Sequence, residues 1–415
     1  MTSQSSNSRG KIATLFATEL PTLWPSMLAK RGDAAGYFPF SDPQIEYSYF
    51  ARIAVWMAAN RIGLANAEVL VPAYHHGVEI EALVAAGAVP VFYPVGPQWQ
   101  VDPQEVERLI TPRTRALYLT HFAGFPGPTR AMREMADRHG LPLIEDCALS
   151  LLSRDGDTPL GSTGDYGIFC LYKTLPVPNG GALVTNEGER AGDERRTTKY
   201  RGQVSENSKL KIQNSKLNSI PLKSPPLLST VSHMASLYLQ NLEMRGGAWG
   251  RMVRSQVRRL GRETVEVAGI ERVTTGSDHF NPEHTNLGMS AWSKRILHAQ
   301  NVERIRRVRR RNYLYLLREL GEDVMPLLPT LPRGVCPLFY PLIVPDKEQA
   351  QERLVGRGIA AVNFWRHSHP SCDLTKFPDV ARLRATVLEI PCHQDLSRGA
   401  MREIIKNVRQ TLREL

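Results

Sequence analysis

The sequence predicts an α/β fold in which a large domain with a mostly parallel sheet precedes a smaller α/β domain. Between residues 47 and 185, short apolar runs typical of buried strands alternate with segments whose apolar residues recur at helical spacing. Strands separated by helices of this length form parallel sheets that carry helices on both faces. The length of 415 residues, of which 42% are hydrophobic, is enough for one large core and a second, smaller one.

The large domain begins with a helix and a strand. Apolar residues recur at helical spacing from Ala51 to Ile62, and the strand Glu68–Pro72 follows them. Because ligands lie beyond the carboxyl ends of parallel strands, we expect chemistry just after each apolar run. The later elements are predicted as helices at Glu79–Ala86, Pro103–Ile110 and Thr129–His139, and as strands at Val89–Tyr93, Arg115–Thr120, Leu141–Glu145, Gly167–Tyr172 and Gly180–Thr185.

The second half of the chain opens with a change in composition. Residues 203–228 are rich in Ser, Asn, Lys and Pro and contain the tetrapeptide NSKL twice, which predicts a flexible insertion. Beyond it we expect one long helix at Ser290–Leu320, a strand at Pro337–Val344 and helices at Lys347–Arg357 and Ser397–Leu415. The predicted parts are an N-terminal segment (1–45), the large domain (46–200), the insertion (203–228), a connecting helical region (229–290), and the long helix with the small domain (291–415).

The chain carries a net charge of +11, and its densest basic run is Arg304–Arg311. Such an excess of positive charge is compatible with the binding of anionic small molecules as well as of nucleic acids. Ile305 and Val308 lie three residues apart within the run, as on one buried helix face, which favours an ordinary solvated helix. We therefore expect no nucleic-acid partner.

The cysteines and the N-terminus indicate a reducing compartment. Five cysteines without a C-x-x-C spacing argue against a disulfide framework and a zinc site. The pair His367 and His369, with His393, is a weak metal candidate because no carboxylate-rich helix accompanies it, and we expect no metal. Residues 1–10 lack the apolar core of a signal peptide, and no stretch approaches the roughly 18 apolar residues of a membrane span. A cytoplasmic protein without a membrane partner is expected.

Asp146 and Lys173 are the strongest candidates for chemistry. Each follows an apolar run and is expected at the ligand-binding edge of the sheet. A partly buried salt bridge is the simpler interpretation of the two residues. The alternative is a catalytic amine, because desolvation lowers the pKa of a lysine and makes it a nucleophile toward carbonyl groups.

Several segments around these two residues occur together in a known family. They are ITPRTRALYLTHFAG at 110–124, HGLPLIEDCA at 139–148, GDYG at 164–167, and Lys173 followed by GGALVT at 180–185. In their order, their residue identities and most of their spacing, these segments resemble the DegT/DnrJ/StrS aminotransferases, which depend on pyridoxal phosphate. The resemblance implies a fold-type I aminotransferase with a large domain built on a mostly parallel, seven-stranded-type sheet, and a small C-terminal α/β domain.

The resemblance also implies the roles of individual residues. Lys173 resembles the lysine that binds the cofactor covalently and moves a proton at the substrate carbon. Asp146 resembles the partner of the protonated ring nitrogen. Ala51 and Arg52 occupy the family's helix-opening positions, where backbone N–H groups and the helix dipole favour the cofactor phosphate, and Arg52 adds a cationic contact.

Three further positions follow from the family pattern. Counting four residues from Pro72 gives His76 as the ring that stacks on the cofactor, with His75 as the second choice. The role of His121 stays open. The segment NLGMS at 286–290 resembles the family's Asn-x-Arg-Met-Ser, whose asparagine reaches the cofactor phosphate of the neighbouring subunit, so Asn286 implies a homodimer with shared sites.

The chain departs from the family pattern at three positions. Leu149 replaces a glutamine near the cofactor ring, and Gly288 replaces the arginine of the Asn-x-Arg-Met-Ser motif. Cys170 stands nearest to the expected phosphate-binding serine, and a thiol is a weak donor. These changes indicate a divergent member of the family.

Three functions remain open on this basis. The first is transfer of an amino group from a glutamate-like amino acid to a keto sugar or nucleotide-linked keto sugar, in polysaccharide or secondary-metabolite biosynthesis. The second is a transaminase or lyase reaction on a non-sugar substrate, which Leu149 and Gly288 motivate. The third is a binding or regulatory protein with a degenerate site, which the presence of both Lys173 and Asp146 disfavours.

Overall fold

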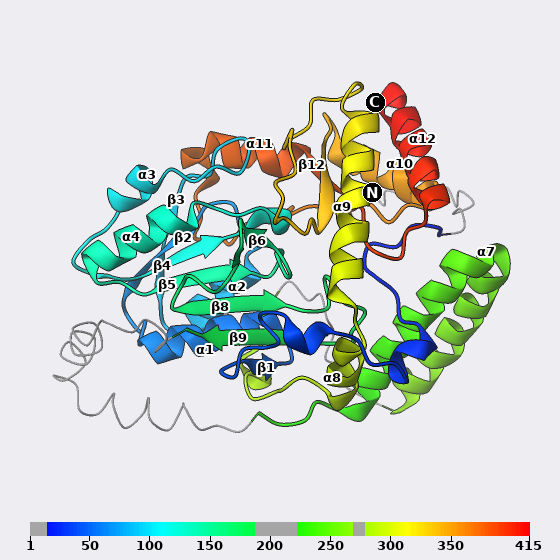
Figure 1. The fold of residues 1–415 in the computed structure, drawn as a ribbon, viewed down its shortest axis with the longest axis horizontal. Helices are drawn as coiled ribbons and strands as arrows, with labels where there is room; N and C mark the ends of the chain where they lie inside the picture. Colours follow the sequence, from blue (N-terminus) through cyan, green and yellow to red (C-terminus); the bar gives the residue numbers. More distant parts are fainter. Residues whose placement is uncertain (1–14, 187–221, 269–278) are drawn as a thin grey trace, which may run out of the picture.

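The computed structural model describes residues 15–186, 222–268 and 279–415, and it contains two main sheets (Figure 1). The larger sheet has seven strands in the order β1-β9-β8-β5-β4-β2-β3, and the strands from β8 to β3 in this order are parallel. The predicted mostly parallel sheet is therefore confirmed. Its strands are β1 Glu46–Ser48, β2 Glu68–Pro72, β3 Val89–Tyr93, β4 Thr114–Thr120, β5 Leu143–Cys147, β8 Tyr166–Cys170 and β9 Gly181–Thr185, and a short hairpin (β6 Arg154–Asp155, β7 Thr158–Pro159) lies between β5 and β8.

Helices cover both faces of this sheet. The helices α1 (Ala51–Ile62) and α2 (Val78–Ala85) share a core with Tyr118 and Ile144, whereas α3 (Pro103–Glu107) and α4 (Thr129–His139) share one with Leu117 and Leu143. Side chains alternate between the faces of a strand. Asp146, two residues after Ile144, therefore lies on the side of α1 and α2.

The predicted single helix Ser290–Leu320 is wrong, because two helices occupy it: α8 (Ala291–His298) and α9 (Val302–Leu320). The N-terminal segment causes the break. The N–H of Gly32 donates to the carbonyl of His298, and the N–H of Asp33 donates to that of Gln300. Asn301 then caps α9 by accepting from the N–H of Arg304.

The helix α7 (Leu227–Ala268) follows the insertion and folds back on itself at Gly247, where φ is +57° (Figure 1). Its two arms pack closely enough for Arg254 to pair with Glu243. The helix starts two residues inside the predicted insertion, and residues 203–221 of that prediction lie outside the described residues. None of the helices in the described part of the chain combines the length and the apolar character needed to cross a membrane.

The C-terminal part is built on a three-stranded antiparallel sheet in the order β10-β12-β11. One face, with Leu388 and Ile390, packs on the helices of the small domain, and the other, with Phe339 and Val387, joins the core of the large domain. The elements are β10 Phe339–Ile343, α10 Lys347–Gly356, β11 Val362–Asn363, α11 Pro378–Thr386, β12 Val387–Pro391 and α12 Arg398–Glu414.

Two buried arginines join the two parts of the chain. Arg309 of α9 donates to the carbonyls of Thr174 and Leu338 and to the side chain of Gln394. Arg384 of α11 donates to the carbonyls of Ala73, His75, Trp365 and His367. Buried donors of this kind stabilise the joint only while their carbonyl partners stay in place.

Replacing Arg309 with Met should lower the free energy of unfolding by about 3 kcal/mol, because several buried carbonyls lose their donor. The exposed Arg304 lies on the same helix, and Arg304→Met should change the value by less than about 0.5 kcal/mol. Urea unfolding followed by circular dichroism measures both. Equal stabilities of the two variants would contradict a joint that depends on Arg309.

Candidate active site

Four neighbouring strands bring the predicted residues to one edge of the large sheet. Lys173 follows β8, Asp146 lies near the end of β5, His121 follows β4, and His75 and His76 follow β2. The strand predicted at Leu141–Glu145 is shifted by two residues, since β5 is Leu143–Cys147. Asp146 is consequently held in the ladder, opposite Thr120 and Ile168.

Asp146 is a buried carboxylate with two neutral donors. The hydroxyl of Tyr118 donates to its Oδ2 at 2.9 Å, and the backbone N–H of Ala148 donates to its Oδ1 at 2.9 Å. Burial, and after it the charge of the nearby Glu79, raise the pKa of Asp146 to about 6, although the charge of Lys173 acts in the opposite direction. No ion pair joins Asp146 to a basic side chain of the described residues.

The loop that carries Lys173 is fixed on both sides of the residue. Before it, the N–H of Leu171 donates to the carbonyl of Gly180 at 3.0 Å. After it, the carbonyl of Thr174 accepts from Gln394 at 2.9 Å and from Arg309 at 3.3 Å. Lys173 therefore stands on a turn that both domains hold, close enough to Asp146 for their charges to interact.

The two histidines after β2 have different surroundings. The Nδ1 of His75 lies 3.0 Å from the carbonyl of Pro72, its Nε2 accepts from the N–H of His369 at 3.0 Å, and its ring stacks on Phe92. Burial lowers the pKa of His75 to about 3, so the ring is neutral. The turn at His76 is held by Glu79, which accepts the N–H groups of His76 and Gly77. Since Glu79 also acts on Asp146, this turn lies beside the carboxylate.

His121 belongs to a buried structural network. Its Nδ1 accepts from the N–H of Gly127, so its Nε2 carries the proton and donates to Glu145 at 2.9 Å. Glu145 also accepts the backbone N–H groups of Gly161, Thr163 and Gly164. Burial raises the pKa of Glu145, but these hydrogen bonds outweigh it and hold the pKa below its usual value.

The start of α1 has the features of an anion site. Ala51 opens the helix, and no side chain of the described residues caps it. Gly181 lies against this end so closely that a Cβ there would meet the Ala51 nitrogen at 2.4 Å. Arg52 lies with its guanidinium 4.1 Å from the centre of the Phe50 ring.

Cys170, the last residue of β8, has hydrogen-bond partners of its own. Its sulfur is hydrogen-bonded to the Tyr172 side chain and the Lys173 backbone, and burial raises the pKa of the thiol. The group therefore stays a thiol with little capacity to donate to a phosphate.

The two other departures from the family pattern are accommodated in apolar or tightly packed places. Leu149 is buried in the core cluster that contains Phe122. Gly288 forms a bridge with Ser48, and a Cβ there would lie 3.1 Å from that of Leu222. The half-buried Asn286 accepts the N–H of Lys223 through its carbonyl at 2.7 Å.

Two carboxylates near Lys173 were not found from the sequence. Glu389 lies in β12 between Leu388 and Ile390, which face the small-domain core, so its own side chain faces the large domain. Glu19 follows a segment that pairs with Ile359, just before the strand β11 that pairs with Glu389. The charges of both carboxylates interact with that of Lys173. The sequence signal was a glutamate inside the apolar run VLEIP.

Phe364 and Trp365 are buried in an aromatic cluster with Tyr74 and Phe122. The histidines considered as metal ligands have partners of other kinds. His393 is buried next to Thr18, whereas His369 bonds to Ser371. The described residues contain no group of three or more His, Cys, Asp or Glu side chains arranged to hold a metal ion.

Comparison with known proteins shows which enzymes this chain is similar to. Residues 52–220 match the model of the DegT/DnrJ/EryC1/StrS aminotransferase family. This segment is therefore similar to that family. Its relatives include the L-glutamine:2-deoxy-scyllo-inosose aminotransferase of Streptoalloteichus tenebrarius, 39% identical over 127 residues, and the dTDP-3-amino-3,4,6-trideoxy-alpha-D-glucose transaminase of Streptomyces venezuelae, 36% identical over 174 residues. These matches cover 30% and 40% of this chain, and 30% and 45% of the respective relatives.

Solved structures extend the likeness to the whole fold. The aminotransferase TlmJ from Streptoalloteichus hindustanus has a TM-score of 0.63 at 19% identity, over 96% of this chain and 99% of TlmJ. A DegT DnrJ EryC1 StrS aminotransferase from Brucella abortus has a TM-score of 0.60 at 18% identity, over 94% of this chain and 91% of that protein. The large domain and the C-terminal part together thus have the fold of these aminotransferases.

Glu389 should give the stability of the chain a specific pH dependence. Burial, and after it the charge of Glu19, raise its pKa from 4.5 to about 8, although the charges of Lys173 and Lys347 act in the opposite direction. Between these two values the folded chain holds a proton that the unfolded chain has lost, so the free energy of unfolding falls as the pH rises. Glu389→Gln removes this titration, and its melting temperature should fall less than that of the unmodified chain between about pH 5 and 8.

The exposed Glu403 provides a control, since Glu403→Gln should leave the pH profile unchanged. Scanning calorimetry across this range measures all three proteins. Parallel profiles for the unmodified chain and Glu389→Gln would contradict a half-buried Glu389 that binds a proton on folding.

Proposed function

We propose that this chain is a pyridoxal-phosphate-dependent aminotransferase with Lys173 as its catalytic residue. The buried carboxylate of Asp146 is the observation that carries the proposal. Its bonded partners are the neutral groups of Tyr118 and Ala148, and its pKa is raised to about 6 by burial first and Glu79 second. Asp146 would pair with a protonated ring nitrogen, whose positive charge would stabilise a buried carboxylate that has no ion-pair partner among the described residues.

The residues at the site fit the remaining parts of this cofactor. The uncapped start of α1, at Ala51 and Arg52, is suited to the phosphate, and the turn at His76 is placed beside Asp146. His75 and Cys170 suit the cofactor less well, because their polar atoms already have partners. When bound, pyridoxal phosphate withdraws electrons from the substrate carbon that carries the amine.

The reaction then requires three actions from the chain. Asp146 keeps a proton on the ring nitrogen, and the α1 terminus holds the phosphate in place. The Lys173 amine removes a proton from the substrate carbon and returns one during the reverse half-reaction. The hydrogen bonds to Thr174 from Arg309 and Gln394 fix the position from which this amine acts.

The names of the relatives support a proposal for the substrate class. Their names specify L-glutamine as a donor, a keto-cyclitol as an acceptor and a dTDP-linked amino sugar as a product. We propose a glutamate-like amino-acid donor and a keto sugar or nucleotide-linked keto sugar as acceptor, in polysaccharide or secondary-metabolite biosynthesis. The proposed form is a homodimer in which Asn286 contacts the cofactor phosphate of the neighbouring subunit.

A non-sugar substrate is the second candidate. The burial of Leu149 in an apolar core and the tight packing at Gly288 favour it, because both positions lose the polar side chain of the family pattern. A mass-spectrometric screen with glutamate and glutamine as donors distinguishes the two. Amination of keto sugars supports the first candidate, whereas product release from an amino acid without any acceptor supports a lyase.

The cofactor assignment predicts a graded response to substitution. Lys173→Ala should abolish transamination, and Asp146→Asn should weaken pyridoxal phosphate binding by roughly 10- to 100-fold because one charge-assisted hydrogen bond is lost. The exposed Asp157→Asn should leave binding unchanged. Titration of the cofactor's visible absorbance measures these affinities, and equal affinities of Asp146→Asn and Asp157→Asn would refute the role of Asp146.

A further inference from the structure

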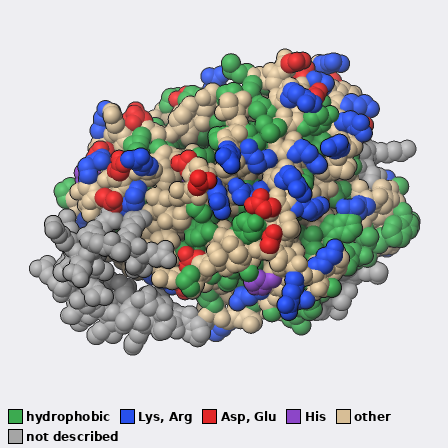
Figure 2. All heavy atoms as spheres, in the orientation of Figure 1, with side chains coloured by type: hydrophobic (Ala, Val, Ile, Leu, Met, Phe, Trp, Pro, Cys, Tyr) green, Lys and Arg blue, Asp and Glu red, His purple; other side chains and the backbone are tan. Residues whose placement is uncertain are grey.

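The outer face of α9 carries a second site-like feature, away from Lys173. A hollow of about 670 Å³ is lined by six arginines and a single carboxylate, that of Glu303. Figure 2 shows Lys and Arg side chains gathering over α9 and α12 on this face of the molecule. The six arginines are Arg306, Arg307, Arg310, Arg311, Arg318 and Arg333.

Helical spacing explains why so many cations share one surface. Positions three and four apart lie on the same face of a helix, which aligns Arg306 with Arg310 and Arg307 with Arg311. Arg309 points to the opposite face, where it contacts the carbonyl of Thr174. The hollow and the Lys173 loop are thus on opposite sides of α9.

The protein neutralises little of the charge in this hollow. Glu303 pairs with Arg306 at 3.2 Å. Arg310 donates through Nη1 to the carbonyls of Pro332 and Val335, which carry no net charge. Arg307 and Arg333 make no hydrogen bond or ion pair with the described part of the chain. Arg318 pairs with Glu319, which lies outside the lining, at 2.7 Å. The other four of the six arginines have no carboxylate partner among the described residues.

The hollow is also a place where these charges interact unfavourably. Burial lowers the pKa of Arg310, and the charge of Arg306 lowers it further. Burial and the charges of Arg398, Arg304 and Arg307 act in the same direction on Arg311. A bound anion would relieve this repulsion.

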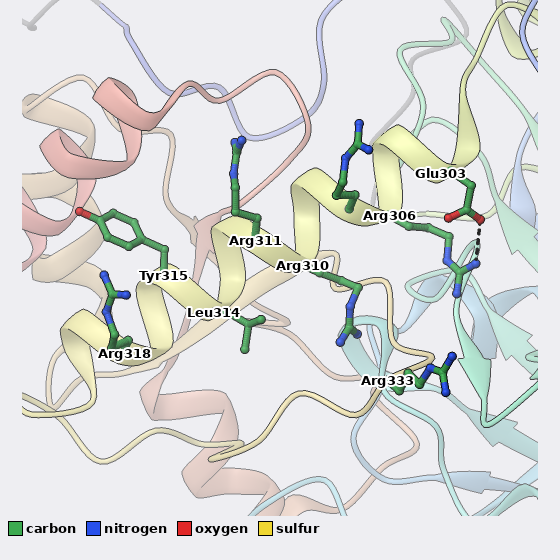
Figure 3. Close-up of a pocket in the computed structure, with 9 residues that line it drawn as sticks. Glu303, Arg306, Arg310, Arg311, Leu314, Tyr315, Arg318 and Arg333 are labelled. Atoms are coloured by element: carbon green, nitrogen blue, oxygen red, sulfur yellow. Dashed lines mark hydrogen bonds and ion pairs between the residues drawn. The ribbon is translucent and has the colours of Figure 1, made fainter.

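The side chains converge on one part of the hollow. Figure 3 shows Arg310 and Arg333 extending into the same space, next to the guanidinium of Arg306 that pairs with Glu303, whereas Arg311 extends away. The lining contains arginines and no lysine. Guanidinium groups bind phosphate oxygens in pairs with a fixed geometry, which a lysine cannot do.

We propose that this hollow binds a small soluble anion that carries two or more phosphate groups, held by Arg306, Arg310 and Arg333. Its volume lies within the range of small-molecule sites, which is roughly 300–1,000 Å³. Several guanidinium groups require more negative charge than one phosphate supplies. The proposal is independent of the proposed transamination, because none of these arginines contacts the Lys173 loop.

Calorimetric titration of the full chain with inorganic pyrophosphate tests the site. Pyrophosphate should bind, and inorganic phosphate should bind at least about tenfold more weakly. Arg333→Gln and Arg310→Gln should each raise the dissociation constant for pyrophosphate about tenfold, the effect of one lost charge-assisted contact. Arg304→Gln, on the same helix but outside the lining, should leave it within about twofold.

Arg333→Gln is the decisive variant. The Arg333 side chain makes no hydrogen bond or ion pair with the described residues, so its replacement should leave the melting temperature unchanged. Equal binding of pyrophosphate by Arg333→Gln and Arg304→Gln would overturn the proposal. The proposal would also be overturned if an oligonucleotide or anionic phospholipid vesicles bound more tightly than pyrophosphate and Arg333→Gln weakened that binding as well. That result would assign the surface to a nucleic acid or a membrane.

Discussion

The structure depends on two adjacent carboxylates at the end of one parallel strand. Burying a carboxylate costs several kcal/mol unless it is well compensated. Strand alternation sends Glu145 and Asp146 to opposite faces of the sheet. Glu145 is compensated by His121 and by the backbone N–H groups of Gly161, Thr163 and Gly164, which fix the chain just before β8. Glu145 thus fixes the path of the strand that leads to Lys173, whereas Asp146 has no ion-pair partner among the described residues.

The joint between the two parts of the chain places the lysine in a defined position. Arg309 and Gln394 both donate to the carbonyl of Thr174, next to Lys173, and Arg384 donates to the carbonyls of Ala73 and His75 after β2. These contacts tie the small domain to two of the loops that form the site. The faces of α9 consequently have separate roles: the inner face supports the lysine loop, and the outer face carries the arginine hollow.

The sequence predicted the large domain well because its signals are local. The apolar runs gave β2 and β3 with their observed bounds, and the helix Thr129–His139 was also predicted correctly. The break between α8 and α9 was missed, because it depends on contacts with Gly32 and Asp33, nearly 270 residues away. The same limit applies to the site. The charges of Glu19 and Glu389 act on Lys173 only because the small domain and the N-terminal segment pack against the large domain, which no local pattern records.

The central claim is that Lys173 binds pyridoxal phosphate. Borohydride reduction of the protein loaded with the cofactor, followed by peptide mapping with mass spectrometry, tests it most directly. The account predicts one phosphopyridoxyl group per chain, on the peptide that contains Lys173, and much less labelling in Asp146→Asn at limiting cofactor. Labelling spread over exposed lysines, or a label on the Lys173 peptide that is unaffected by Asp146→Asn, would contradict it.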